Sequence, residues 1–126
     1  TPRLDRMDHA ATMLGRIVPS VMATGFDGIF LVVTNPVDLM TWLVQQLSGL
    51  PDTRVIGTGT ALDTARLRFY LADALDVDPR SVTACVLGEH GEEQMIPWSQ
   101  VAVAGKPLAG KPSAIPSRRS PIIWRR

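Results

Sequence analysis

The sequence predicts an α/β fold in which at least two strands run parallel. Short apolar runs rich in β-branched residues alternate with longer segments whose apolar residues recur every three or four positions. Runs of the first kind are typical of buried strands and stripes of the second kind of amphipathic helices, and the strand–helix–strand order favours parallel pairing. With 126 residues, of which 45% are hydrophobic and 20% charged, the chain is long enough to form a packed core.

The first predicted elements are a long helix and a strand. Apolar residues recur at helical spacing over residues 4–24, where Pro19 is expected to kink the helix and Gly25 to end it. Residues 28–34 form a continuous apolar run, which predicts a strand buried on both faces of a parallel sheet.

A second helix and a second strand follow. Asn35 is predicted to be the N-cap and Pro36 the first helical residue, with Asp38 in the first turn near the positive end of the helix dipole. Gly49 is predicted to close this helix, and residues 54–58 are predicted to form the next strand.

The third predicted helix begins after Thr60 and runs to about Leu75. Thr60 and Asp63 have the spacing of a capping pair. The apolar side chains that this helix is expected to bury are Leu62, Ala65, Phe69 and Ala72.

The last third of the chain predicts two further strands and an irregular end. A turn is expected at residues 78–81, a strand at 82–87, another strand at 98–104 and a turn at 105–107. Residues 109–126 are rich in Pro, Ser, Lys and Arg, without helical or strand periodicity, and are predicted to form an irregular basic tail.

Composition excludes several classes of protein. The net charge of +1 indicates neither a nucleic-acid nor a membrane partner, and no apolar run is long enough for an ordinary transmembrane helix. A single cysteine, Cys85, cannot form an intramolecular disulfide, which favours a reducing compartment such as the cytoplasm. No metal site is predicted, and nothing near Cys85 would activate it as a nucleophile.

Three side chains stand out as a set that could do chemistry. Histidine is the side chain best suited to give a proton to a carbonyl oxygen near neutral pH, and His90 lies between two glycines. A carboxylate on its other ring nitrogen would stabilise the charged ring, and Asp63 is the leading candidate. The planar guanidinium of Arg66, three residues later on the predicted helix and so expected on the same face as Asp63, could hold a substrate carboxylate. Glu89 is a weaker candidate, because adjacent side chains on extended backbone point apart.

Reduction of a 2-oxo acid by a nicotinamide requires such a set of groups beside the cofactor. Asn35 lies at a predicted strand-to-helix junction, where ligands bind at the carboxyl edge of a parallel sheet.

Three motifs in register resemble the L-lactate dehydrogenase branch of the lactate/malate dehydrogenase family. They are Thr34-Asn35-Pro36-Val37-Asp38, the segment Val55–Arg66, and Leu87-Gly88-Glu89-His90-Gly91. The Asp-Thr-Ala-Arg and Asp-Pro-Arg-Ser-Val segments are also similar to L-2-hydroxyisocaproate dehydrogenases. The resemblance covers about residues 3–108.

That resemblance implies a role for each candidate residue. His90 would be the proton donor and acceptor and Asp63 its partner. Arg66 would bind the substrate carboxylate, while Asn35, which would hydrogen-bond the reacting oxygen, and Asp38 would also contact substrate. The nicotinamide end of NAD would lie near Val33, Thr34, Asn35 and Thr58.

The resemblance also implies an organisation of the chain. Residues 1–60 would be the end of a Rossmann-type dinucleotide-binding domain, residues 61–108 the start of an α+β substrate domain, and the fold would be partial. The family's glycine-rich phosphate-binding segment, its mobile loop and its C-terminal helices have no counterpart here, so a truncated form is expected. The full-length family implies a homo-oligomer, a dimer or a tetramer.

Several functions remain open. Lactate/pyruvate is the first expectation for the substrate, a branched 2-hydroxy acid the second and malate the third. A catalytically inactive remnant, acting only by association with other chains, is the alternative from a different class.

Overall fold

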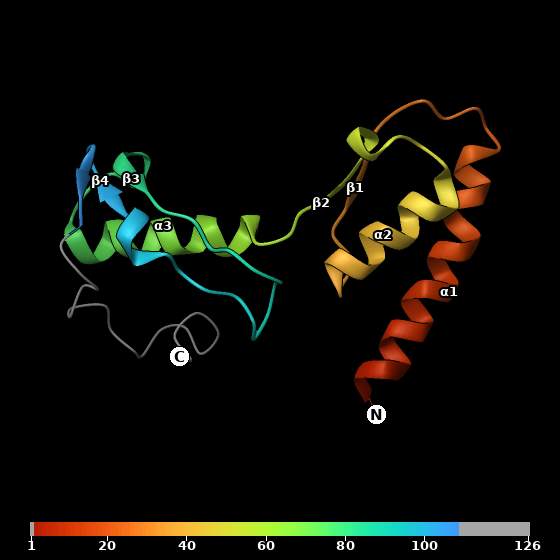
Figure 1. Cartoon of the computed structure of the whole chain (residues 1–126), viewed down its shortest axis with the longest axis horizontal. Helices are drawn as coiled ribbons and strands as arrows, with labels where there is room; N and C mark the ends of the chain where they lie inside the picture. The colour runs from red at the N-terminus through yellow and green to blue at the C-terminus, as the bar shows by residue number, and fades with distance from the viewer. Residues whose placement is uncertain (1, 109–126) are drawn as a thin grey trace. The chain divides into compact units, whose positions relative to one another are not determined.

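The computed structural model describes residues 2–108, with side chains from Met7 onward, and divides into two compact units (Figure 1). The first unit comprises Thr1–Gly59 and the second Thr60–Arg126. Both units combine helices with short strands, and the strands of the first unit are parallel, so the predicted α/β class is confirmed. Within the described residues, no helix is both long enough and apolar enough to cross a membrane. The predicted tail, residues 109–126, lies outside the described residues.

The first unit contains the predicted parallel pair. Strands β1 and β2 are joined through a helix, and Leu31 lies opposite Ile56 in the parallel register. A crossover helix between neighbouring parallel strands is the usual way to connect them. The elements are α1 (Pro2–Met22), β1 (Phe30–Val32), α2 (Val37–Ser48), η1 (Asp52–Arg54) and β2 (Val55–Gly57).

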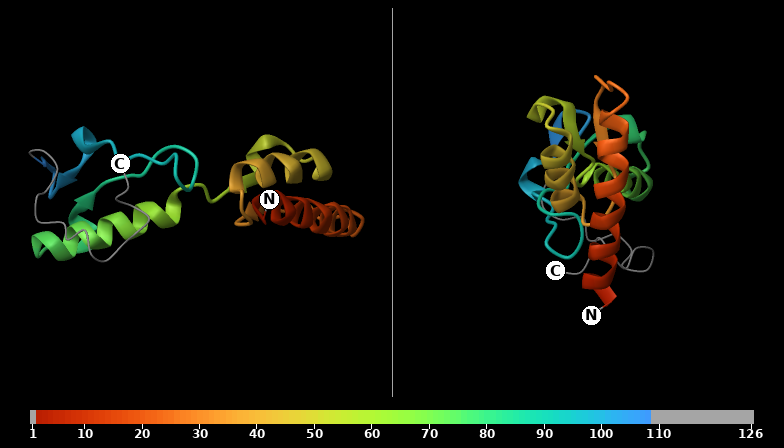
Figure 2. Two further views of the ribbon diagram at one scale, coloured as in Figure 1. Left: turned by 90° about the horizontal axis from the view of Figure 1, so that it is seen from below. Right: turned by 90° about the vertical axis from the view of Figure 1, so that its right-hand side faces the viewer.

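Both helices of this unit contribute to a core on one face of the sheet. Helix α1 lies alongside α2 (Figure 2), and Val18 of α1 and Met40 of α2 pack in one cluster with Val32 of β1. On the opposite face, Leu31 is 64% exposed and Ile56 is 46% exposed. The prediction that strand 28–34 is buried on both faces is therefore wrong, because among the described residues the helices cover only one face.

Of the two predicted ends of α2, the N-terminal cap is wrong and the C-terminal glycine is confirmed. The N-cap position belongs to Pro36, whose ψ of 120° is extended, so the helix begins at Val37 without a side-chain cap from Asn35. The Asn35–Pro36 peptide bond is cis. At the other end, Gly49 has a φ of 63°, and its N–H donates to the carbonyl of Gln45 over 3.1 Å. Gly49 therefore ends the helix as predicted.

The second unit packs one long helix against short antiparallel strands. Strand β4 pairs with both β3 and β5. The strand predicted at 98–104 is a 3-10 turn followed by β4, and the turn predicted at 105–107 is wrong, because Lys106–Pro107 form β5 and the chain reverses at Ala104 and Gly105. The elements are α3 (Ala61–Leu75), η2 (Pro79–Ser81), β3 (Val82–Thr83), η3 (Trp98–Gln100), β4 (Ala102–Val103) and β5 (Lys106–Pro107).

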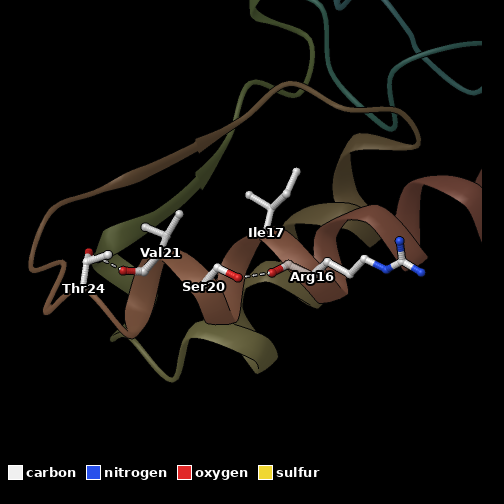
Figure 3. A pocket seen from close by; sticks show the side chains of 5 residues that line it. All are labelled: Arg16, Ile17, Ser20, Val21 and Thr24. Atoms are coloured by element: carbon white, nitrogen blue, oxygen red, sulfur yellow. Dashed lines mark hydrogen bonds between the residues drawn. The ribbon is translucent and has the colours of Figure 1, made fainter.

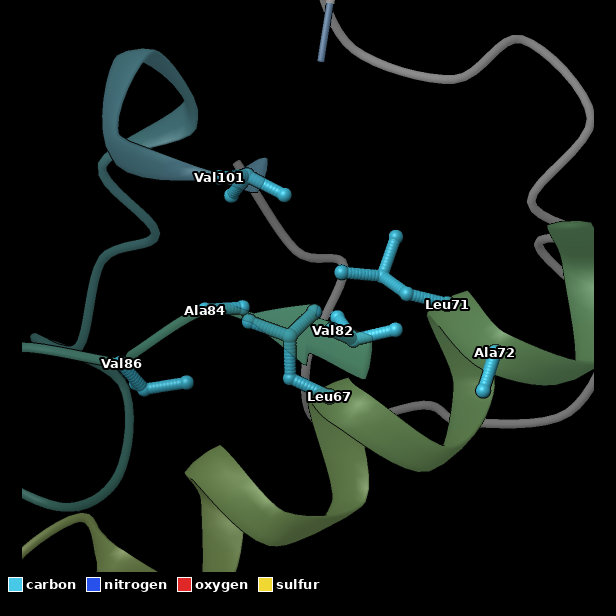
Figure 4. Close-up of a cluster of buried hydrophobic side chains, with 7 residues drawn as sticks. All are labelled: Leu67, Leu71, Ala72, Val82, Ala84, Val86 and Val101. Atoms are coloured by element: carbon cyan, nitrogen blue, oxygen red, sulfur yellow. The ribbon is translucent and has the colours of Figure 1, made fainter. Parts of the chain in front are cut away.

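The core of this unit lies between α3 and the segment that starts with β3. Alternate side chains of that segment point toward α3 (Figure 4), as expected of extended backbone. The buried set is Leu67, Leu71, Ala72, Val82, Ala84, Val86 and Val101. Of the predicted core positions on α3, Ala72 is correct, whereas Leu62 and Phe69 are 57% and 60% exposed and Ala65 is exposed. The buried row instead begins at Asp63 and continues through Leu67 and Leu71.

Candidate functional site

His90 lies on a loop whose ends are held together. Leu87 and Met95 form an antiparallel bridge, with N–H to carbonyl distances of 2.9 and 2.8 Å. Just inside the bridge, Gly88 has a φ of 93°, and a Cβ at this position would lie 2.8 Å from the carbonyl oxygen of Glu93. The loop therefore requires glycine there, both for its backbone conformation and for space.

The structure brings His90 and Asp63 together across 27 positions of the sequence. The Nδ1 atom of His90 lies 2.5 Å from Oδ2 of Asp63, a hydrogen-bond distance. Asp63 is fully buried, and the side chain of His90 is 30% exposed. Because Nδ1 is engaged with the carboxylate, Nε2 is the ring nitrogen that remains for proton exchange. The second carboxylate oxygen of Asp63, Oδ1, is buried and has no hydrogen-bond partner among the described residues.

Arg66 differs from Asp63 in its surroundings, although both lie in the first half of α3. Arg66 is exposed and makes no hydrogen bond or ion pair within the described part of the chain. Both residues lie on α3, three positions apart as expected, but they differ in burial, because Asp63 faces the core whereas Arg66 is exposed. The guanidinium of Arg66 is free to bind an anion. Glu89, the weaker candidate to orient His90, is exposed, and within the described residues it makes no hydrogen bond to the ring.

The remaining predicted site residues follow the two parallel strands of the first unit. Val33, Thr34 and Asn35 continue β1, and Thr58 continues β2. The Thr58 N–H donates to the carbonyl of Val32 over 2.9 Å, so the pairing extends one residue beyond the strands. Val33 is 65% exposed, Asn35 is exposed and Thr34 is half-buried. These residues lie at the carboxyl edge of the sheet, where open α/β sheets bind ligands.

Asp38 lies in the first turn of α2 and is exposed. It makes no hydrogen bond or ion pair to another residue described by the structure. Its carboxylate is therefore available to a ligand or to solvent.

Three side chains of α3 and its N-cap bind the backbone before the His90 loop. The hydroxyl of Thr60 donates to the carbonyl of Val86 over 2.6 Å, and the N–H of Val86 donates to the hydroxyl of Thr64 over 2.9 Å. Nε of Arg68 donates to the carbonyl of Ala84 over 3.0 Å. The predicted capping role of Thr60 is wrong in this respect, since its side chain caps no helical N–H. Local spacing carries no signal for these bonds, because their partners lie 16 to 26 positions away.

An open hollow of about 460 Å³ on α1 lacks the chemistry of a site. Its walls are made by one face of α1 and the turn that follows it (Figure 3), with two hydroxyls that already donate to helix carbonyls. Arg16 contributes the only charged group to the lining. The lining residues are Arg16, Ile17, Ser20, Val21 and Thr24. The hollow therefore lacks the converging polar groups that distinguish a ligand pocket.

Comparison with known proteins assigns the chain to a family. Residues 1–57 match the NAD binding domain of lactate/malate dehydrogenase, and residues 60–114 match the alpha/beta C-terminal domain of the same enzymes. The chain belongs to the lactate/malate dehydrogenase family. Its resemblance to the L-lactate dehydrogenase branch, expected from three sequence motifs, is confirmed by the relatives that it matches.

Those relatives in the lactate/malate dehydrogenase family are longer than this chain. L-lactate dehydrogenase 3 of Bacillus cereus is 56% identical over 106 residues, which make up 84% of this chain and 34% of that protein. L-lactate dehydrogenase 1 of Bifidobacterium longum is 47% identical over 107 residues, again 34% of its length. The chain thus spans about a third of the length of the curated relatives it matches.

Solved structures of family members agree with the fold. The minor L-lactate dehydrogenase of Enterococcus mundtii matches with a TM-score of 0.74 and 57% identity, over 77% of this chain and 31% of that one. The L-lactate dehydrogenase of Clostridium thermocellum matches with a TM-score of 0.80 and 39% identity, over 86% of this chain and 37% of that one.

Proposed function

We propose that this chain carries the proton-transferring and substrate-anchoring residues of an NAD-dependent L-2-hydroxy-acid dehydrogenase, with lactate and pyruvate as the substrate pair. The observation that carries the proposal is the contact of 2.5 Å between His90 Nδ1 and the fully buried carboxylate of Asp63. A buried carboxylate that orients a partly exposed imidazole is the arrangement a general acid–base catalyst needs. The relatives in Bacillus cereus, Staphylococcus saprophyticus and Bifidobacterium longum are L-lactate dehydrogenases, which supports the substrate.

His90 would move the proton of the reaction. In the direction of reduction, the imidazolium donates its Nε2 proton to the oxygen of the 2-oxo group. The neutral ring that remains keeps the Nδ1 proton, which it donates to Oδ2 of Asp63. Asp63 therefore selects one tautomer of the ring and leaves Nε2 for the transfer. In the reverse direction, Nε2 accepts the proton from the hydroxyl of the 2-hydroxy acid.

Arg66, Asn35 and Asp38 would bind the substrate. Arg66 is exposed and free of protein partners within the described residues, so both prongs of its guanidinium are open to a carboxylate. Asn35 would donate its amide N–H to the reacting oxygen. Asp38, in the first turn of α2, is the third polar side chain that we assign to substrate binding.

The carboxyl edge of the β1–β2 pair fits the nicotinamide end of NAD. Val33 would offer an exposed apolar surface to a flat ring, and Thr34, Asn35 and Thr58, which follow the same two strands, would add hydrogen-bonding groups. When bound, the nicotinamide supplies the hydride that reaches the 2-oxo carbon. These residues orient the ring, and they take no part in proton transfer.

Two further properties belong to the proposal. Branched 2-hydroxy acids and then malate are the next substrates to test. A reducing cytoplasm is supported by the single cysteine, and a homo-oligomer is expected of the complete protein.

A chimera tests the catalytic assignment. Residues 1–108 would replace the matching segment of the Bacillus cereus enzyme, which is 56% identical. We expect pyruvate-dependent oxidation of NADH, and we expect His90→Gln to lower kcat/KM by about two to four orders of magnitude. His9→Gln is the matched control, because His9 is an exposed histidine on α1. Near-normal turnover by the His90→Gln chimera would refute the assignment.

The inactive-remnant alternative is favoured by the uncovered sheet face, where Leu31 and Ile56 are exposed. Calorimetric titration of the 126-residue chain with NADH separates the two possibilities. Binding at about tens of micromolar supports a working nucleotide site. Absence of binding at millimolar NADH supports the remnant.

A further inference from the structure

Beyond Thr83, the backbone that leads to the His90 loop has no neighbouring strand in the described part of the chain. Strand β3 pairs with β4 only at Val82 and Thr83. From Ala84 to Val86 the side chains still alternate, with Ala84 and Val86 buried against α3. Buried peptide groups need hydrogen-bond partners, so something other than a strand must satisfy this segment.

Side chains of α3 and its N-cap residue supply those partners. Both peptide groups of Val86 are engaged, its carbonyl by the hydroxyl of Thr60 at 2.6 Å and its N–H by the hydroxyl of Thr64 at 2.9 Å. The two hydroxyls therefore hold one residue from two sides. We call this pair of bonds the threonine clamp.

The threonine clamp lies close in the sequence to both members of the acid–base pair, Asp63 and His90. Asp63 stands between Thr60 and Thr64 in the sequence, directly before the second of them. On the other side, Val86 precedes the bridge of Leu87 that closes the His90 loop. The same two bonds thus join the first turn of α3, which carries the carboxylate, to the segment that leads to the imidazole.

We propose that Thr60 and Thr64 are positioning residues that hold Asp63 within hydrogen-bond distance of His90, an inference that rests on the proposed function of that pair. The reason is mechanical. The pair spans 27 positions and makes a single hydrogen bond of 2.5 Å, so a small shift of α3 against the segment would break it. Both clamp bonds are half-buried, where loss of a partner leaves a peptide group unsatisfied.

The test uses NMR of the full 126-residue chain, which contains two histidines. The signal to follow is the Nδ1 proton of His90, whose exchange with water the bond to Asp63 slows. His9, which is exposed, is the internal reference. The variants are Thr60→Val, Thr64→Val and the double variant, because valine keeps the shape of threonine and lacks the hydroxyl.

We expect the double variant to speed exchange of the His90 Nδ1 proton about tenfold and to mix the two ring tautomers, with smaller effects of the same sign in the single variants. Thr60→Ser with Thr64→Ser should restore the wild-type signals. Thr41→Val is the matched control, since its half-buried hydroxyl also donates over 2.6 Å but within α2.

Unchanged His90 signals in folded single or double valine variants would overturn the proposal, as would a serine variant that fails to restore them. If the double variant unfolds, the single variants and the serine rescue decide. The readout needs neither nucleotide nor substrate. An inactive chimera with responsive His90 signals refutes only the proposed function, and an active one with unresponsive signals refutes only the threonine clamp.

Discussion

At the scale of single residues, the buried carboxylate of Asp63 opposes the stability of the fold. Among side chains that the structure describes, Asp63 is the one polar or charged residue in the buried class. One of its oxygens accepts from His90, and the other has no partner among the described residues. Burial of a half-satisfied carboxylate is unfavourable. Such a residue is better explained by the chemistry of its partner than by stability.

Replacement of Asp63 by Asn should therefore separate stability from function. Asn has the same shape and no charge to desolvate, so we expect the free energy of unfolding of the chain to stay level or to rise by about 1 kcal/mol. In the chimera, the same change should lower kcat about a hundredfold or more. Denaturant unfolding and steady-state kinetics measure the two effects, with exposed Asp73→Asn on the same helix as control. A large loss of stability in Asp63→Asn would contradict this account.

Gly88 sets the shape of the His90 loop. A Cβ there would lie 2.8 Å from the carbonyl oxygen of Glu93. The loop would also force a residue with a side chain to adopt a φ of 93°. We expect Gly88→Ala to destabilise the chain by about 1–3 kcal/mol. Gly15→Ala is the opposite case, because nothing lies within 4 Å of that position inside α1. It should stabilise by about 0.5–1 kcal/mol. Thermal unfolding of both variants tests the pair, and equal effects would contradict the argument.

At the scale of elements, local patterns predicted helices and strands better than the faces they bury. The bounds of α3 follow from its helical spacing, and Gly49 ends α2 by conformation alone. The buried face of α3 was predicted wrongly because Asp63, a polar residue, occupies the row that an apolar stripe would assign. Thr60 was expected to cap α3, but its hydroxyl bonds Val86, which is 26 positions away. Contacts at such separation leave no periodicity in the sequence.

The geometry of the candidate site also depends on contacts between residues that are far apart in the sequence. The proximity of His90 to Asp63 was expected from the resemblance and not from spacing, since 27 positions separate them. Helical spacing places Arg66 near Asp63 on α3, but it does not predict that Asp63 is buried while Arg66 is exposed. The catalytic and binding roles of these residues stay predictions until the chimera is assayed.

The short helix η2 gives a pH-dependent prediction. The side chain of Arg80, and then its backbone N–H, donate to Asp78 and hold the pKa of that carboxyl below its ordinary value of 3.8. A lowered folded-state pKa adds stability above 3.8 that is lost as the pH falls through the lowered value. Asp78→Asn should therefore lower Tm at neutral pH, and the difference from wild type should shrink in acid. Thermal scans across pH test this, and a difference that grows in acid would contradict it.

At the scale of the whole molecule, the uncovered face of the β1–β2 pair is the main consequence of how this chain is built. The helices of the first unit gather on one side of the sheet, where Val18, Val32 and Met40 pack together. The other side exposes a contiguous apolar set on neighbouring strands, because Leu31 and Ile56 are register partners. Apolar patches of this kind, beside unpaired strand edges, promote association between chains.

We expect the isolated chain to self-associate through this face, and Leu31→Lys to prevent it. Leu31 is 64% exposed, so a lysine there can extend into solvent without disturbing the core on the other face. Sedimentation velocity over a concentration series should show a wild-type coefficient that rises with concentration and a variant that stays monomeric. Leu62→Lys is the matched control, since Leu62 is 57% exposed but lies on α3 in the other unit. If both lysine variants reduce association equally, added charge and not the sheet face explains the effect. If neither does, the chains associate elsewhere.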